Sequence, residues 1–121
     1  MFELSQTFSF DAAHTLKRQV SPEEAAGSRR IHGHTYTAEV IVRGERQPAS
    51  GMVVDLAVLR EVIANVRSQL DHHFLDEVAG LGAPTLENLC VFIHDRVREQ
   101  IPQVAGVAVS RAAGDRCVYR P

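Results

Sequence analysis

The 121-residue sequence predicts an α+β fold, in which an antiparallel sheet of four strands carries two helices on one face. Two stretches near the N-terminus and two near the C-terminus have the pattern of strands, and the two stretches between them carry apolar residues at helical spacing. Consecutive strands joined by short turns favour antiparallel pairing. We therefore expect the order ββααββ, in a single domain that comprises residues 1–121.

The first two predicted strands flank a polar loop. From Phe2 to Phe10 apolar and polar residues alternate, which is the period of a strand with one buried face. Residues 17–30 are mostly polar and include a proline and a glycine, so we expect a loop with a short helical turn at 22–25. Thr, Tyr, Val and Ile predominate at about 34–43, and they favour a second strand.

Two helices are predicted in the middle of the chain. After a short extended piece at 52–54, Asp55 can cap a helix over about 56–70. Thr85, which follows a proline, announces a second helix, and Pro102 stops it. The apolar stripes of the two helices are Leu56, Leu59, Ile63, Val66 and Leu70 in the first, and Leu86, Leu89, Cys90, Ile93, Val97 and Ile101 in the second.

The C-terminal part of the chain predicts the last two strands. Val104–Arg111 is the third, residues 114–115 form a turn, and residues 116–120 are the fourth. A sheet this small leaves exposed edges that a protein must cover or pair. We therefore expect a homo-oligomer, although the composition does not set the number of subunits.

The composition is that of a soluble globular protein and argues against several classes. The net charge is −2, so no basic footprint indicates nucleic acid. No apolar run approaches the roughly 20 residues of a membrane span, and the alternating N-terminus is unlike a signal peptide. We expect a cytoplasmic protein without membrane or nucleic-acid partners. Its two cysteines do not make a disulfide framework.

Three histidines predict a zinc site. His32 and His34 lie two apart at the start of the second strand, so their side chains share a face. His14 follows the first strand, and a hairpin of these strands would bring it near both. Three neutral imidazoles suit Zn²⁺ and leave a fourth position open, as in catalytic sites. The alternative is that His32 and His34 are surface or capping residues.

Asp71 and His72 form a candidate acid–base pair just after the first helix. A carboxylate beside an imidazole can orient it and raise its pKa, which suits a proton shuttle. The alternative is a histidine that interacts with the dipole at the helix C-terminus. The local sequence by itself favours this second interpretation.

Six motifs follow one another over essentially the whole chain: Phe8–His14, Ile31–His34, Gly51–Leu56, Leu70–Leu75, Pro84–Asn88 and Cys117–Arg120. Together they resemble the motifs of the 6-pyruvoyl/6-carboxy-tetrahydropterin synthase family. The short length is closer to the bacterial 6-carboxytetrahydropterin synthases, which act in queuosine biosynthesis, than to the animal enzymes.

The resemblance implies a fold and a reaction. The family has the tunnelling fold, in which ββααββ subunits form a trimeric barrel, two trimers stack, and active sites lie between subunits. The bacterial enzymes are lyases that act on 7,8-dihydroneopterin triphosphate. Zinc acidifies the side-chain hydroxyls, a thiolate and an Asp-His pair move protons, and triphosphate and acetaldehyde leave. By match, the zinc ligands would be His14, His32 and His34, the proton relay Asp71 and His72, and the positions near the pterin pocket Thr85 and Glu87.

The family's catalytic cysteine is replaced here. Its position, four residues before His32, is Ser28, and a serine hydroxyl is far more basic than a thiol. Glu23 or Glu24 could supply a carboxylate base, since some relatives use Glu in place of the Cys. We expect Cys90 to be buried core, and nothing favours Cys117 as the base.

The family's pterin anchor also differs. A Glu at the end of the third strand pairs with the ring's amino group, and an ungapped match places Arg111 there. A guanidinium has donors only. Either Asp115 takes over, or the substrate offers acceptors, or Arg111 is simply solvated. A smaller departure is Asp76, where relatives often have Asn.

These observations leave three hypotheses. The leading one is a zinc-dependent lyase on a dihydroneopterin-type substrate. The second is an enzyme of the same fold on a different small molecule. The third is a catalytically silent zinc-containing binding or assembly protein, against which the intact Asp71 and His72 argue.

Overall fold

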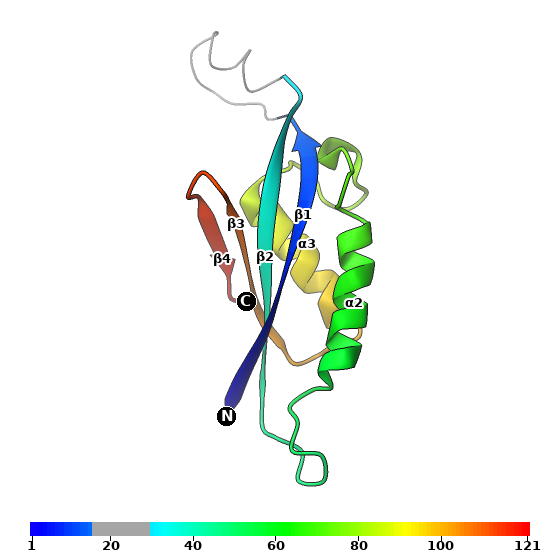
Figure 1. Cartoon of the computed structure of the whole chain (residues 1–121), viewed down its shortest axis with the longest axis vertical. Coiled ribbons are helices and arrows are strands. Elements are labelled where there is room, and N and C mark those ends of the chain that lie inside the picture. The colour runs from blue at the N-terminus through cyan, green and yellow to red at the C-terminus, as the bar shows by residue number, and fades with distance from the viewer. Residues whose placement is uncertain (16–29) are drawn as a thin grey trace.

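The sheet and the two helices occur in the predicted order, which confirms the α+β fold. The computed structural model describes residues 1–15 and 30–121, and the four strands lie in the order β1-β2-β3-β4, with every neighbouring pair antiparallel. Figure 1 shows α2 and α3 on the same side of the sheet. The elements are β1 (Phe2–His14), β2 (His32–Gly44), α2 (Leu56–Ser68), the 3-10 helix η1 (Leu75–Glu77), α3 (Leu86–Arg98), β3 (Val104–Arg111) and β4 (Arg116–Tyr119).

β1 and β2 form a hairpin longer than predicted. They pair without interruption from Phe2 opposite Gly44 to His14 opposite His32. The alternation of polar and apolar residues in the sequence weakens after Phe10. The backbone of β2 nevertheless continues to supply hydrogen-bond partners, so pairing extends β1 beyond the segment with strong strand propensity.

The prediction of an extended piece at 52–54 is wrong, because the chain bends at residues 53–54. Gly51 has a φ of 74°, and its N–H donates to the carbonyl of Gln47. The Gln47 N–H in turn donates to the carbonyl of Met52. These bonds close a local loop before Asp55, whose side chain accepts from the N–H of Ala57 and caps α2 as predicted.

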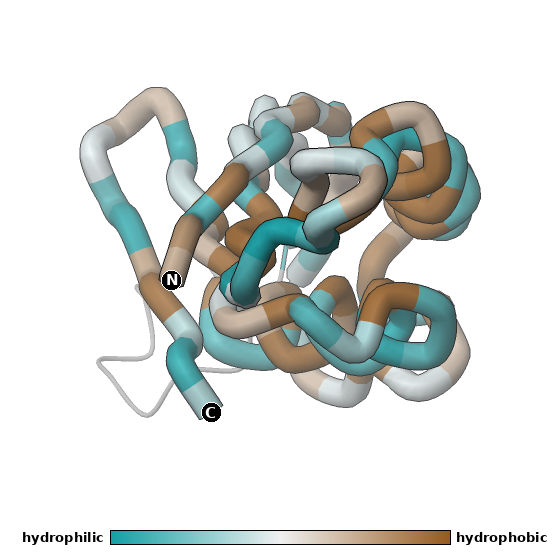
Figure 2. The backbone as a smooth tube through the Cα atoms, turned by 90° about the horizontal axis from the view of Figure 1, so that it is seen from below, coloured by the Kyte–Doolittle hydropathy of each residue, from teal (hydrophilic) through white to brown (hydrophobic). Residues whose placement is uncertain are grey.

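The core lies between the helices and one face of the sheet. Phe10, Tyr36 and Val40 supply that face, and Leu59 of α2 and Ile93 of α3 pack over it, all at most 1% exposed. Hydrophobic and hydrophilic stretches alternate along the chain, as the colours of Figure 2 show. Burial of apolar area on this face is the main force that holds the helices to the sheet.

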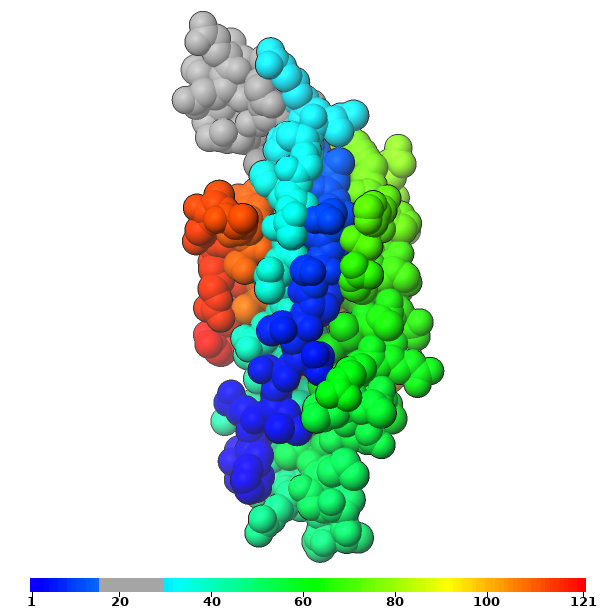
Figure 3. Space-filling view, in the orientation of Figure 1, coloured from blue at the N-terminus to red at the C-terminus, as the bar shows by residue number. Residues whose placement is uncertain are grey.

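The opposite face of the sheet lies at the surface. Figure 3 shows residues of β1, β2, β3 and β4 along this side of the molecule. In β1 the exposed and buried side chains alternate, as the period of two requires. No helix in the described part of the chain is long and apolar enough to cross a lipid bilayer.

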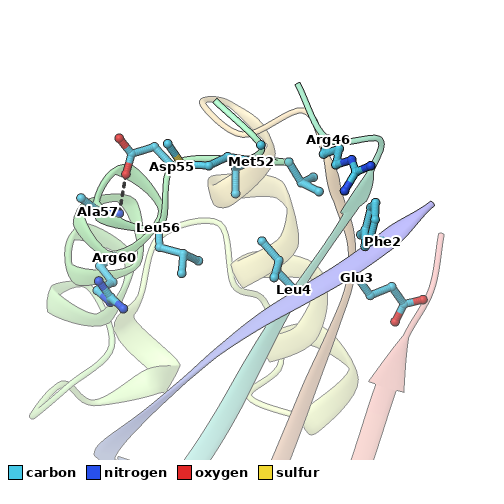
Figure 4. A pocket seen from close by; sticks show the side chains of 12 residues that line it. Phe2, Glu3, Leu4, Arg46, Met52, Asp55, Leu56, Ala57 and Arg60 are labelled. Carbon is cyan, nitrogen blue, oxygen red and sulfur yellow. Dashed lines mark hydrogen bonds between the residues drawn. The ribbon is translucent and has the colours of Figure 1, made fainter. Parts of the chain in front are cut away.

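A cavity of about 500 Å³ lies at the end of the sheet where β1 begins. Figure 4 shows Phe2, Leu4, Met52 and Leu56 around it, with Arg46 beside Phe2. Phe2 and Met52 remain 47% and 44% exposed. The lining also includes the charged residues Glu3, Arg46, Asp55 and Arg60, so the cavity is mixed in character.

Leu59 and Val58 test the core assignment, because they are neighbours on α2 with opposite exposure. Leu59 is fully buried and Val58 is 45% exposed. Leu59→Ala should lower the free energy of unfolding by about 2–5 kcal/mol, and Val58→Ala by about 0.5 kcal/mol or less. Urea titration followed by circular dichroism measures both. Equal losses in the two variants would contradict the packing of α2 on this face.

Candidate metal centre

Three histidines converge at the end of the β1–β2 hairpin. His14 lies opposite His32, and Ala12 lies opposite His34, so the three imidazoles share one face of the sheet. The ring centroid of His14 lies 4.3 Å from that of His32 and 5.0 Å from that of His34. The ring centroids of His32 and His34 lie 5.2 Å apart. Their nearest ring nitrogens all lie within 4.8 Å of one another.

Backbone carbonyls hold two of these rings in one tautomer. His14 Nδ1 lies 3.1 Å from the carbonyl oxygen of Thr15, and His32 Nδ1 lies 2.8 Å from that of Arg30. An Nδ1–H that donates to a carbonyl leaves the Nε2 lone pair free, as in metal-binding histidines. In the described part of the chain, Nε2 of His14 and Nε2 of His34 are buried without a hydrogen-bond partner. The cluster could therefore hold a metal ion.

The electrostatics of the cluster favour neutral imidazoles. Burial lowers the pKa of His14, whose exposed fraction is 2%. Burial, followed by the nearby charge of Arg111, lowers the pKa of His34. A metal ion binds the neutral ring, so both shifts suit ligands that must not be protonated near neutral pH.

Asp71 fastens the segment after α2 to the edge of β1. Its Oδ1 accepts from the N–H of Asp11 at 2.9 Å, and its Oδ2 lies 3.2 Å from Nη2 of Arg67. The bond from Asp11, with the charge of Arg67, holds the pKa of the Asp71 carboxyl below its usual value. His72 Nε2 is 3.7 Å from the same carboxylate, so the predicted pair is adjacent.

His72 is held in an unusual backbone conformation. Its φ is 58°, the one positive value of a non-glycine residue in the described part of the chain. Its N–H donates to the carbonyl of Asp11 at 2.7 Å, which fixes this turn against β1. Because α2 ends at Ser68, His72 lies beyond the last turn, where the dipole has little effect. The helix-dipole interpretation is therefore not supported.

The imidazole of His72 lies on the opposite side of the sheet from the cluster of three histidines in its own chain. It groups with the side chains of Asp11 and Asp71, whose ligand atoms lie within 4.8 Å of one another. Asp11 alternates with Ala12 and His14 along β1, so it points to the opposite face. The His72 side chain is 79% exposed. It is thus free to face another molecule.

Arg111 lies beside the three histidines. It pairs in register with Tyr36, two residues along β2 from His34 and on the same face. Its Nη2 forms an ion pair of 2.5 Å with Oδ2 of Asp115, and the arginine side chain is only 25% exposed. The interpretation that Arg111 is simply solvated is therefore wrong. Ser28, Glu23 and Glu24 lie outside the described residues.

Comparison with known proteins identifies the family. The profile of 6-pyruvoyl tetrahydropterin synthase matches residues 3–121. The chain belongs to this family. It is 33% identical to the 6-carboxy-5,6,7,8-tetrahydropterin synthase of Bacillus subtilis, over 99% of this chain and 86% of that protein. It is 37% identical to the dihydroneopterin monophosphate aldolase of Pyrococcus furiosus, over 78% of this chain and 73% of that protein.

Solved structures give the same result for the fold. The 6-pyruvoyl tetrahydropterin synthase of Caenorhabditis elegans superposes with a TM-score of 0.85 at 26% identity, and the match covers 99% of this chain and 95% of that one. The antiparallel sheet with two helices on one face is the tunnelling fold of the family, as the sequence motifs predict.

The remaining family positions have structural roles that the sequence did not predict. Thr85 accepts from the N–H of Asn88 at 3.1 Å and caps α3, and Glu87 is exposed in the first turn of the helix. Figure 1 shows that α3 begins at the end of the sheet where β1 ends, and β1 ends at His14. Asp76, noted only as a departure, accepts from the N–H of Thr15 at 2.8 Å and fastens the chain just after His14.

Both cysteines pack in or against the core. Cys90 is fully buried in the core, as predicted, and burial, with the neighbouring Cys117, raises its pKa to about 12. A thiol with so high a pKa does not ionise near neutral pH. Cys117 lies on β4 opposite Val109, which is buried in the core.

Substitutions at His32 and His73 test the histidine cluster as a metal site. Each ring is hydrogen-bonded to a nearby backbone carbonyl, but only His32 belongs to the cluster. We expect about one metal ion per chain in the purified protein. His32→Ala should remove most of it, whereas His73→Ala should retain it. Elemental analysis of both variants, with thermal melts to confirm folding, gives the answer. Equal metal content in all three proteins would reject the cluster as the binding site.

Proposed function

We propose that this protein is a zinc-dependent lyase of pterin metabolism that acts on a phosphorylated dihydroneopterin. The observation that carries the proposal is the cluster of His14, His32 and His34, whose rings converge with two buried Nε2 atoms unpaired in the described part of the chain. Three neutral imidazoles suit Zn²⁺, and three protein ligands leave room for a substrate oxygen. When bound, the ion would supply Lewis-acid chemistry that makes substrate hydroxyls more acidic.

The protein's own residues would orient the zinc ligands and move protons. The carbonyls of Thr15 and Arg30 hold His14 and His32 in the ligand tautomer. Asp71, already bound to β1 and Arg67, would hold His72 as the acid–base residue of the relay. Ser28 and Glu24, with Glu23, stay as candidates for the base that the family's cysteine supplies.

The active site would lie between subunits. His72 is exposed on the face of the sheet opposite to the histidine cluster, so it cannot serve the metal of its own chain. The exposed sheet face and the exposed Phe2 and Met52 offer surface for contact with other copies. We therefore propose a homo-oligomer, a trimer or a hexamer, in the cytoplasm, with no nucleic-acid or membrane partner.

Two reactions fit this site. The relative in Bacillus subtilis is a 6-carboxytetrahydropterin synthase, which would place this protein in queuosine biosynthesis with 7,8-dihydroneopterin triphosphate as its substrate. The relative in Pyrococcus furiosus is a dihydroneopterin monophosphate aldolase. Arg111 beside the cluster favours the further alternative, a different small molecule with acceptor groups. Thr85 and Glu87, at the start of α3, would line the pocket.

Turnover of the zinc-loaded protein tests the proposed function. It should convert 7,8-dihydroneopterin triphosphate or the monophosphate to products identifiable by mass spectrometry. Asp71→Asn and His72→Gln should each lower turnover by about 10²–10⁴-fold, because general acid–base help is lost, while the zinc content stays near one per chain. If neither substrate reacts, the proposed function is rejected. If both variants keep full turnover, the pair is structural.

Mixed oligomers test whether the site is shared between copies. His32→Ala and His72→Gln should each be nearly inactive alone. Co-expressed in equal amounts, they should regain about a quarter of wild-type turnover, because half of the clusters and half of their neighbouring His72 groups stay intact. A mixture as inactive as its components would place both halves of the site in a single chain. His73→Ala co-expressed with His32→Ala is the control for subunit exchange.

A further inference from the structure

Three buried polar side-chain atoms lack a hydrogen-bond partner in the described part of the chain, and all three lie together. They are Nε2 of His14, Nε2 of His34 and Nε of Arg111. The two imidazole nitrogens present lone pairs, which a cation satisfies. The arginine Nε–H is a donor, which a cation cannot satisfy. An acceptor in addition to a metal ion would therefore satisfy all three atoms.

Asp115 leaves this donor unused. The carboxylate bonds to Nη2 of Arg111 through Oδ2, and that ion pair fixes the guanidinium at the β3–β4 turn. The arginine backbone N–H also donates to the Asp115 carbonyl at 3.0 Å, so both groups are tied to the turn. Within the described residues, Nε is buried without a partner on the face that carries His34 and Tyr36, and the Tyr36 hydroxyl also lies beside the guanidinium. A buried N–H without a partner is costly, and a ligand acceptor would remove that cost.

We propose that Arg111 Nε–H donates to a carbonyl oxygen of the substrate ring, so that this site selects a 2-oxo (lumazine-type) ring over the 2-amino ring of a pterin. The proposal rests on the proposed function, which puts a dihydroneopterin-like ligand at the metal, and it further places the ring of that ligand beside Arg111 of β3. A ring amino group facing Arg111 would set donor against donor. A carbonyl at the same ring position accepts from Nε and leaves the pair of Arg111 with Asp115 in place.

Two ligands that differ at one position test this selection. Neopterin and the 2-oxo analogue made from it by deamination carry the same trihydroxypropyl side chain. Titration of the zinc-loaded protein, followed by calorimetry, gives both dissociation constants without turnover. We expect the 2-oxo ring to bind roughly tenfold more tightly or better, since a buried polar mismatch is relieved. Equal binding, or tighter binding of neopterin, overturns the proposal.

Variants of Arg111 and Asp115 identify the atom responsible. Arg111→Lys keeps the positive charge but lacks Nε, so it should lose most of the preference. Arg111→Glu should reverse it in favour of neopterin. If instead the free oxygen of Asp115 anchors a ring amine, Asp115→Asn should abolish neopterin binding while Arg111→Lys changes little, and that result also overturns the proposal.

The outcome is distinguishable from failure of the proposed function. Turnover of the dihydroneopterin phosphates with no preference for the 2-oxo ring rejects the role of Arg111 and leaves the lyase in place. Tighter binding of the 2-oxo ring without turnover of either phosphate supports the role of Arg111 and rejects the pterin substrate. If zinc is bound and neither ring binds, the selection is overturned.

Discussion

The register between β1 and β2 is the constraint on which the metal cluster depends. His14 lies directly opposite His32, and Ala12 lies opposite His34, so three side chains reach one point from two strands. A slip of one residue would send the imidazoles of one strand to the other face, because strand side chains alternate. The register is set by apolar residues such as Phe10 and Tyr36, whose rings stack 4.9 Å apart. Packing in the core thus fixes the positions of the three histidines.

The segment after α2 secures the same hairpin from its open edge. Hydrogen bonds join His72 to Asp11 and Ala13 to His73, and Asp71 adds a side-chain bond to Asp11. These contacts use the edge groups of β1 that another strand would otherwise need to pair. They also hold the His72 imidazole away from the cluster of its own chain. The same interaction that completes the fold therefore separates the two halves of the proposed site.

The positive charge of Arg111 acts on the histidine cluster. Burial and Arg111 both lower the pKa of His34, which favours the neutral imidazole that a metal ion would bind. The guanidinium that contributes to this effect is itself paired to Asp115 and keeps one buried donor unused. Imidazole nitrogens that could hold a cation lie beside an arginine donor, and this combination suits a ligand with oxygen atoms at both places.

The sequence by itself determined the order of elements, the cap at Asp55, the start of the second helix near Thr85, and the histidine triad, because periodicity, capping and strand alternation are local signals. It also supplied the family motifs. Only the tertiary structure decided that β1 reaches His14, that residues 53–54 bend, and that Arg111 pairs with Asp115. It also placed His72 on the far face of the sheet from the histidines. These features depend on pairing and packing between segments distant in the chain, which no local pattern encodes.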